Sequence, residues 1–236
     1  MHHSFIDRYS HLDSMLHRLD PRTKIIACLS FVLSVVLTPP HQAFQFAGYG
    51  AVIAFLIVVS SVPPAYVVKR SLTVLPFVLV VSICTALGRN GAGRWMVWGL
   101  LAKAWLAALF VILLSSTTGF ADMLKGLERL RVPPVFIMVL SFMYRYIFIL
   151  GDEAMRMERA RQLRSFGNTR GQIRVFGNMV GSLFVRAFER GERVYQSMLA
   201  RGFDGEIRTL SPCAFAARDF LFLALVAVVL GAIKLW

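Results

Sequence analysis

Two arginines in the last third of the chain stand in similar surroundings, thirty-seven residues apart. Arg201 lies in the stretch ERVYQSMLARGFDG and Arg164 in the stretch ERARQLRSFG. In both, a small residue and then a phenylalanine follow the arginine. A guanidinium group binds a carboxylate through two parallel hydrogen bonds, and an aromatic ring beside it can fill a pocket on a protein partner. The pattern therefore indicates two docking ends for other proteins.

The residues that follow the two arginines fit the end of a helix. Ser165 and Gly202 are small, so the backbone can turn there, and a glycine just past a helix is a common stop. For a single copy, the attraction between an arginine and the helix dipole would be a sufficient explanation. That explanation leaves out Phe166 and Phe203, which lie just beyond the cap in both copies. Two copies predict two equivalent receiving sites, which a dimer or a pair of homologous subunits would supply.

The segments that lead into both arginines have the pattern of amphipathic helices. Between residues 182 and 203, apolar side chains recur at spacings of three, four and seven, which places them on one helix face. The other face carries arginines and glutamates, including Glu189 and Arg193 at the favourable spacing of four. The segment 151–167 is similar. Helices of this kind also lie on anionic membrane surfaces, and amphipathicity alone leaves that alternative open.

The remainder of the chain is typical of an integral membrane protein. Of its 236 residues, 57% are hydrophobic and only 17% are charged, whereas soluble domains carry about 25% charged residues. A proline at position 76 predicts a kink in the third apolar run, because proline disrupts a helix interior. The runs approach the ~20 residues that a spanning helix needs; they cover 25–37, 44–62, 71–87, 95–115, 135–150 and 214–236.

The charge distribution predicts the topology. The net charge is +13, and because Lys and Arg collect on the cytoplasmic side of membrane proteins, we attribute it to orientation and expect no nucleic-acid partner. Basic residues follow the second and fourth runs, which places those loops and the N-terminus in the cytoplasm. Residues 151–210 contain eleven arginines, and Arg145 lies inside the fifth run, where a charge costs roughly 2.5–3.5 kcal/mol. We therefore expect 135–150 to be a helix buried against the bundle near the cytoplasmic face.

The predicted fold is an all-α integral membrane protein with about five transmembrane helices and additional amphipathic cytoplasmic coupling helices. The domains follow from the same pattern. We expect a four-span membrane part at 1–118, a coupling-helix region at 119–210, and a C-terminal transmembrane helix at 211–236.

With these features the chain resembles the transmembrane coupling (T) component of energy-coupling-factor (ECF) transporters, most closely the cobalt-type CbiQ subfamily. The family carries two short Ala-Arg-Gly-like motifs at the ends of coupling helices. Ala200, Arg201 and Gly202 match that motif, whereas the first copy reads Leu-Arg-Ser at 163–165. The N-terminal stretch HLDSMLHRLDPRTKI is also similar to the subfamily.

The resemblance implies a non-catalytic subunit of an ATP-driven ECF-type importer for cobalt, with nickel and vitamins as alternative substrates. Its implied partners are two ATP-binding-cassette ATPases, a substrate-binding membrane (S) subunit, a small accessory membrane subunit and the lipid bilayer. ATP and magnesium would bind to the ATPases, so this chain would carry no cofactor. Its implied place is the bacterial inner membrane, as a multi-pass protein. The implied ATPase-docking residues are Arg164, Ser165, Phe166, Ala200, Arg201, Gly202 and Phe203.

Two other classes of function stay open. A self-contained cation channel or secondary transporter needs polar ligands in its spans, and the apolar runs offer almost no acidic residue or histidine and no visible inverted repeat. A membrane-embedded lipid transferase needs several carboxylates, and only Asp204 and Glu206 lie beside the second motif. The sequence contains no GxxxxGK[ST] phosphate loop and no HExxH metal motif. We therefore predict neither a catalytic nor a metal site.

Overall fold

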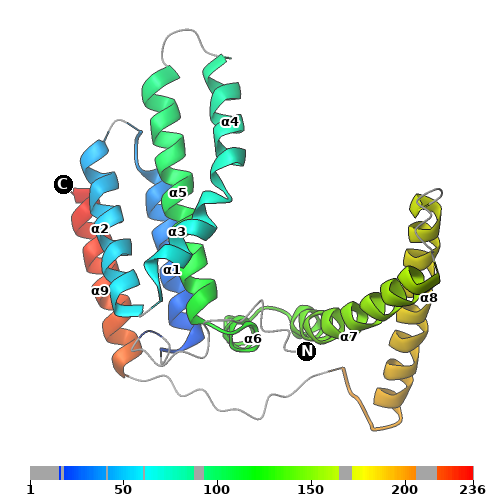
Figure 1. Cartoon of the computed structure of the whole chain (residues 1–236). Helices are drawn as coiled ribbons and strands as arrows, with labels where there is room; N and C mark the ends of the chain where they lie inside the picture. Colours follow the sequence, from blue (N-terminus) through cyan, green and yellow to red (C-terminus); the bar gives the residue numbers. More distant parts are fainter. Residues whose placement is uncertain are drawn as a thin grey trace. The chain divides into compact units, whose positions relative to one another are not determined.

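The structure is a computed structural model that describes residues 16, 19–40, 42–60, 62–87, 93–164, 172–205 and 217–235. Every regular element in this described part is an α-helix (Figure 1). The chain divides into two compact units. The first combines residues 1–130 with 211–236, and the second consists of residues 131–210. The all-α prediction is confirmed.

The first unit is a helical bundle built around α1. This helix packs against α5, α6 and α9, while α2 contacts α5 and α9, as can be followed in Figure 1. In its core, the ring of Phe31 stacks on Phe110 at 4.5 Å and meets the edge of Tyr49 at 5.6 Å. The helices of this unit are α1 (Pro21–Leu37), α2 (Ala43–Ser60), α3 (Pro64–Leu72), α4 (Leu75–Leu87), α5 (Gly93–Thr117), α6 (Phe120–Arg129) and α9 (Ala217–Leu235).

Two local features of the first unit follow directly from proline. Asp20 caps α1 by accepting a hydrogen bond from the backbone N–H of Arg22 at 3.0 Å, with Pro21 in the first turn, where its missing N–H costs nothing. The third apolar run is broken between α3 and α4, which meet at a bend of 40°. The break lies at 73–74, just before Pro76, so the predicted kink is confirmed.

Length and composition show which helices can cross a membrane. Within the described residues, Val97–Thr117 and Pro134–Arg164 are long and apolar enough, and the bent pair α3–α4 is a third if it counts as one span. Phe44–Ser60 in α2 is apolar but shorter. The predicted count of five spans therefore stays a prediction, whereas the membrane character of the fold is confirmed.

The second unit consists of two long helices, α7 (Pro134–Arg164) and α8 (Gln172–Leu199). None of the residues described in this unit is buried. Residues 135–150 form the first half of the continuous 31-residue helix α7, which is long and apolar enough to cross a membrane. The expectation that they are buried against the bundle stays a prediction. A run of apolar residues predicts a helix but does not show where it ends, and here the helix continues through Gly151, which follows the run directly.

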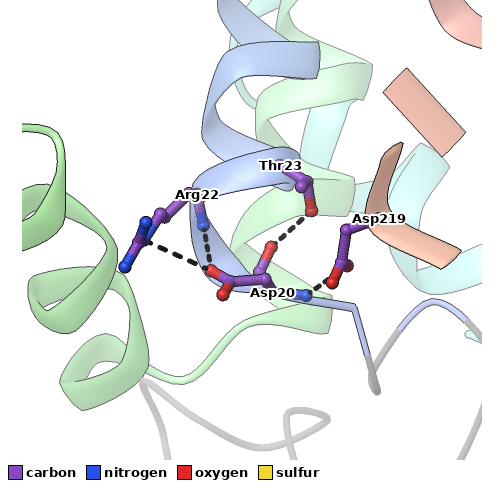
Figure 2. A network of polar contacts seen from close by, with 4 residues as sticks. All are labelled: Asp20, Arg22, Thr23 and Asp219. Atoms are coloured by element: carbon purple, nitrogen blue, oxygen red, sulfur yellow. Dashed lines mark hydrogen bonds and ion pairs between the residues drawn. The ribbon is translucent and has the colours of Figure 1, made fainter. Parts of the chain in front are cut away.

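Polar contacts join three helices at one end of the first unit, and Figure 2 shows those between the starts of α1 and α9. The Asp219 carboxylate at the start of α9 accepts a hydrogen bond of 2.9 Å from the buried backbone N–H of Asp20. Lys24 is buried nearby and donates to the carbonyl of Thr117 at 3.1 Å. The starts of α1 and α9 and the end of α5 are thus held together. Lys103 of α5 donates a further hydrogen bond to the Val36 carbonyl of α1 at 2.9 Å.

Candidate functional site

The second arginine motif forms the C-terminal end of α8. The backbone N–H of Phe203 donates to the Met198 carbonyl at 3.1 Å, and that of Gly202 donates to the Leu199 carbonyl at 3.0 Å. This pair of bonds defines a Schellman motif, in which the residue after the cap takes a left-handed conformation. Gly202 does so, with φ of 77°. Arg201 is therefore the cap residue of a tightly closed helix end.

This geometry separates the two side chains that the sequence grouped together. Phe203 is half-buried and occupies the position that a Schellman motif commonly fills with an apolar residue. The helix stop alone therefore accounts for its type, without a partner protein. Arg201 is exposed, and the motif requires no arginine at that position. The candidate docking group at this end is thus the guanidinium, with Gly202 as the residue that fixes its place.

The first arginine motif lies at the end of α7. Arg164 is the last residue of the helix and is exposed, while Ser165 and Phe166 lie outside the described residues. Glu153 on α7 and Arg186 on α8 form an ion pair between the two helices. Measured along each helix from that pair, Arg164 lies roughly 17 Å away and the end of α8 roughly 20 Å away. The two arginines thus belong to separate helix ends.

Ion pairs distinguish these two arginines from several of their neighbours. Arg156 and Arg193 pair with glutamates on their own helices, at 4.0 and 3.7 Å. Among the described residues, neither Arg164 nor Arg201 has an ion pair. Arg190 on α8 is also exposed and also has no ion pair among the described residues. Availability is therefore necessary for docking but is not by itself the signature of the motif.

Arg161 and Glu158 form a bidentate ion pair in the polar half of α7, beyond the apolar run. The guanidinium of Arg161 donates to both oxygens of Glu158, at 2.8 and 2.6 Å, and the Gln162 amide adds a bond of 3.0 Å. These hydrogen bonds, led by that of Arg161, lower the pKa of Glu158 from 4.5 to about 2. Arg161 is thus held on its own helix and is less available to a partner than Arg164, three residues later.

The apolar face of α8 consists of two neighbouring lines. One is half-buried: Met179, Leu183, Ala187, Val194 and Met198. The other, which we call the exposed line, is open: Phe176, Val180, Phe184, Phe188, Tyr195 and Leu199, each accessible over 47–71% of its surface. The sequence predicted a single apolar face. The division into two lines was missed because periodicity shows which residues share a helix face. It does not show how much of that face a neighbouring helix covers.

The part of the chain that the structure describes contains no group of three His, Cys, Asp or Glu side chains that could hold a metal ion. All five histidines, Glu206 and Cys213 lie outside that part. The second unit presents two exposed guanidinium groups at helix ends, those of Arg164 and Arg201, and a long apolar line on α8.

Comparisons with known proteins show what the chain is similar to. Residues 13–211 match the model of the family described as CbiQ, cobalt transport protein. The chain is 31% identical over 223 residues to the cobalt transport protein CbiQ of Rhodobacter capsulatus, covering 89% of each chain. It is 30% identical over 259 residues to the energy-coupling factor transporter transmembrane protein EcfT of Heliobacterium modesticaldum, covering 98% of this chain and 96% of that protein. A protein of the same name from Listeria innocua is 28% identical over 231 residues, covering 87% and 86%.

Proposed function

The chain belongs to the CbiQ family of cobalt transport proteins, and from this premise we propose that it is the transmembrane coupling subunit of an ATP-driven, ECF-type cobalt importer. It is a transmembrane component of a transporter, and the proposal adds how it works. The observation that carries the proposal is the pair of exposed arginines, Arg164 and Arg201, each without an ion pair among the described residues, at the ends of two helices that bury nothing.

In the proposed mechanism each arginine enters a groove on one ATPase subunit, where a carboxylate receives its guanidinium through two hydrogen bonds. ATP and magnesium bind to those subunits, and this chain itself catalyses nothing. The Schellman end of α8 supports this role, because a closed helix end leaves Arg201 little freedom relative to the helix axis. A displacement of the ATPase is then passed to α8 as a whole.

The apolar surface of the second unit supports a second set of partners. The exposed line of α8 is too long to remain in water, since contiguous apolar patches of this kind mark contacts with proteins or membranes. We assign it to the substrate-binding membrane subunit, with a small accessory subunit and lipid alongside. The ion pair between Glu153 and Arg186 ties α7 to α8, so motion of either helix end reaches this surface.

The proposal requires the second unit to face the cytoplasm of a bacterial inner membrane. Eleven arginines in 151–210 favour that side. A reporter that is active only outside the cell should be inactive when fused after Gly205. The same reporter should be active when fused after Trp236. Reporter activity after Gly205 would place the ATPase-docking ends outside the cytoplasm and would refute the proposed mechanism.

The direct test is retention of the ATPases during purification. Loss of one partner of a desolvated charge pair costs about 2–5 kcal/mol, and each 1.4 kcal/mol is a factor of 10 in affinity. Arg201→Glu should therefore weaken binding by more than about tenfold, and more than Arg201→Ala does. One docked end keeps the other ATPase close, so a single variant should assemble but couple poorly. The double variant of Arg164 and Arg201 should release both ATPases.

Arg190→Glu is the matched control, because Arg190 is an exposed arginine of α8 that also lacks an ion pair among the described residues. It should leave ATPase retention and cobalt uptake unchanged. If the double variant keeps its ATPases, or if Arg190→Glu releases them equally, then general positive charge and not the two helix ends accounts for binding. Uptake of nickel and of vitamins, measured with the same cells, decides the substrate.

A further inference from the structure

A long groove runs along the first unit between α2 and α9. Its volume is about 1260 Å³, and fifteen of its seventeen lining residues are apolar, so its ligand must be largely apolar as well. The side chains of Phe31 and Phe110, which also stack on each other in the core, form part of its lining. Ala51, Val52 and Phe55 line it from α2.

The two polar residues of the groove lie together at the start of α9. Asp219 is turned into the bundle, where its carboxylate accepts the hydrogen bond from Asp20 (Figure 2). Arg218, beside it, is exposed and has no ion pair within the described part of the chain. The groove therefore has an apolar body and one available positive charge at a single end.

The length of the groove matches one leaflet of a membrane. Its α9 wall runs from Arg218 to Leu230, which is roughly 18 Å at the rise of an α-helix. The hydrocarbon core of a bilayer is about 30 Å thick, or about 15 Å for each leaflet. A ligand that lies along the groove with its charged group at Arg218 would thus reach from the membrane surface to the bilayer centre.

We propose that the groove between α2 and α9 binds one anionic phospholipid, with an acyl chain along the groove and the headgroup phosphate on Arg218. The apolar lining matches the chain, and the guanidinium matches the phosphate, which arginine binds through two hydrogen bonds. The charge selects an anionic headgroup over a zwitterionic one. This site lies in the first unit and is independent of the proposed docking of ATPases.

The test is native mass spectrometry of the full-length chain with its copurifying subunits. The complex is taken from nanodiscs of phosphatidylcholine with a minor fraction of phosphatidylglycerol. We expect one retained phosphatidylglycerol. Ala51→Trp fills the groove and should lower its occupancy about tenfold. Ala54→Trp is the matched control, since Ala54 is an exposed alanine of the same helix that does not line the groove. It should keep the lipid.

Arg218 supplies a second, independent measurement. Arg218→Gln should reduce the preference for phosphatidylglycerol over phosphatidylcholine by about fivefold, and Arg218→Lys should retain most of it. An unchanged preference in Arg218→Gln overturns the proposal, even if Ala51→Trp fails to fold. Equal lipid retention in the two tryptophan variants also overturns it. Loss of a copurifying membrane protein from Ala51→Trp, with the lipid retained, would assign the groove to a partner's helix instead.

Discussion

Replacing Asp219 tests how the C-terminal helix is fixed to the bundle. Its carboxylate accepts a hydrogen bond from the backbone N–H of Asp20, which is 199 residues away in the sequence and buried. Asp219→Ala leaves that N–H without its acceptor, and a buried donor left unpaired costs about 1–3 kcal/mol. Asp219→Asn keeps a carbonyl oxygen that can accept the same bond. Neutral hydrogen bonds contribute less than charged ones, so we expect an intermediate loss.

The expected loss is large enough for thermal unfolding in detergent to resolve. In chains of 150–250 residues, 1 kcal/mol shifts the Tm by about 2–4 °C, so a loss of about 2 kcal/mol lowers the Tm by about 4–8 °C. Asp122→Ala is the control, because Asp122 forms an ion pair with Lys125 on the surface, and such pairs contribute at most about 1 kcal/mol. The reasoning fails if Asp219→Ala is no worse than this control, or if Asp219→Asn is as damaging as Asp219→Ala.

Two further predictions concern other contacts. A Cβ on Gly126 of α6 would lie 2.9 Å from the Ile25 side chain of α1, so Gly126→Val should destabilise the bundle by about 1–3 kcal/mol; Gly191→Val, with open space around it, should cost less in the same unfolding assay. The Glu158 carboxylate should titrate near pH 2 by NMR. The ionised Glu158 carboxylate stabilises the fold fully above its ordinary pKa of 4.5, and this effect is lost only as the pH falls through about 2. Arg161→Gln should move the midpoint of the titration back towards 4.5. A midpoint near 4.5 in the unaltered protein would contradict the prediction.

The features that short sequence patterns determine were predictable. The start of α1 at Asp20 and Pro21, and the break before Pro76, depend on residues within one or two turns. The closed end of α8 depends on Gly202 in the same way. Each is a case in which backbone sterics and one local hydrogen bond decide the structure, so no knowledge of the rest of the fold was needed.

The features that distant residues determine were not predictable. The hydrogen bond between Asp20 and Asp219 joins helices from opposite ends of the chain. Nothing in the type of either residue predicts that the other is its partner. The burial of 135–150 was inferred from the eleven arginines of 151–210 and from the cost of Arg145 in a membrane. In the structure these residues belong to a single helix that continues to Arg164 without interruption, which the apolar run did not indicate. A charge penalty states what a segment avoids, and it does not specify which surface the segment packs against.

None of the residues described in the second unit is buried. This has a consequence for how much of the protein a cell retains. Two helices that bury nothing derive little stability from each other, so most of their stability must come from whatever covers them. A copy made in excess of its partners would keep the apolar side chains of α8 accessible, and quality-control proteases remove polypeptides in that condition. The amount of this subunit would then follow the amount of its partners through degradation alone, which keeps the subunit ratio constant without matched synthesis.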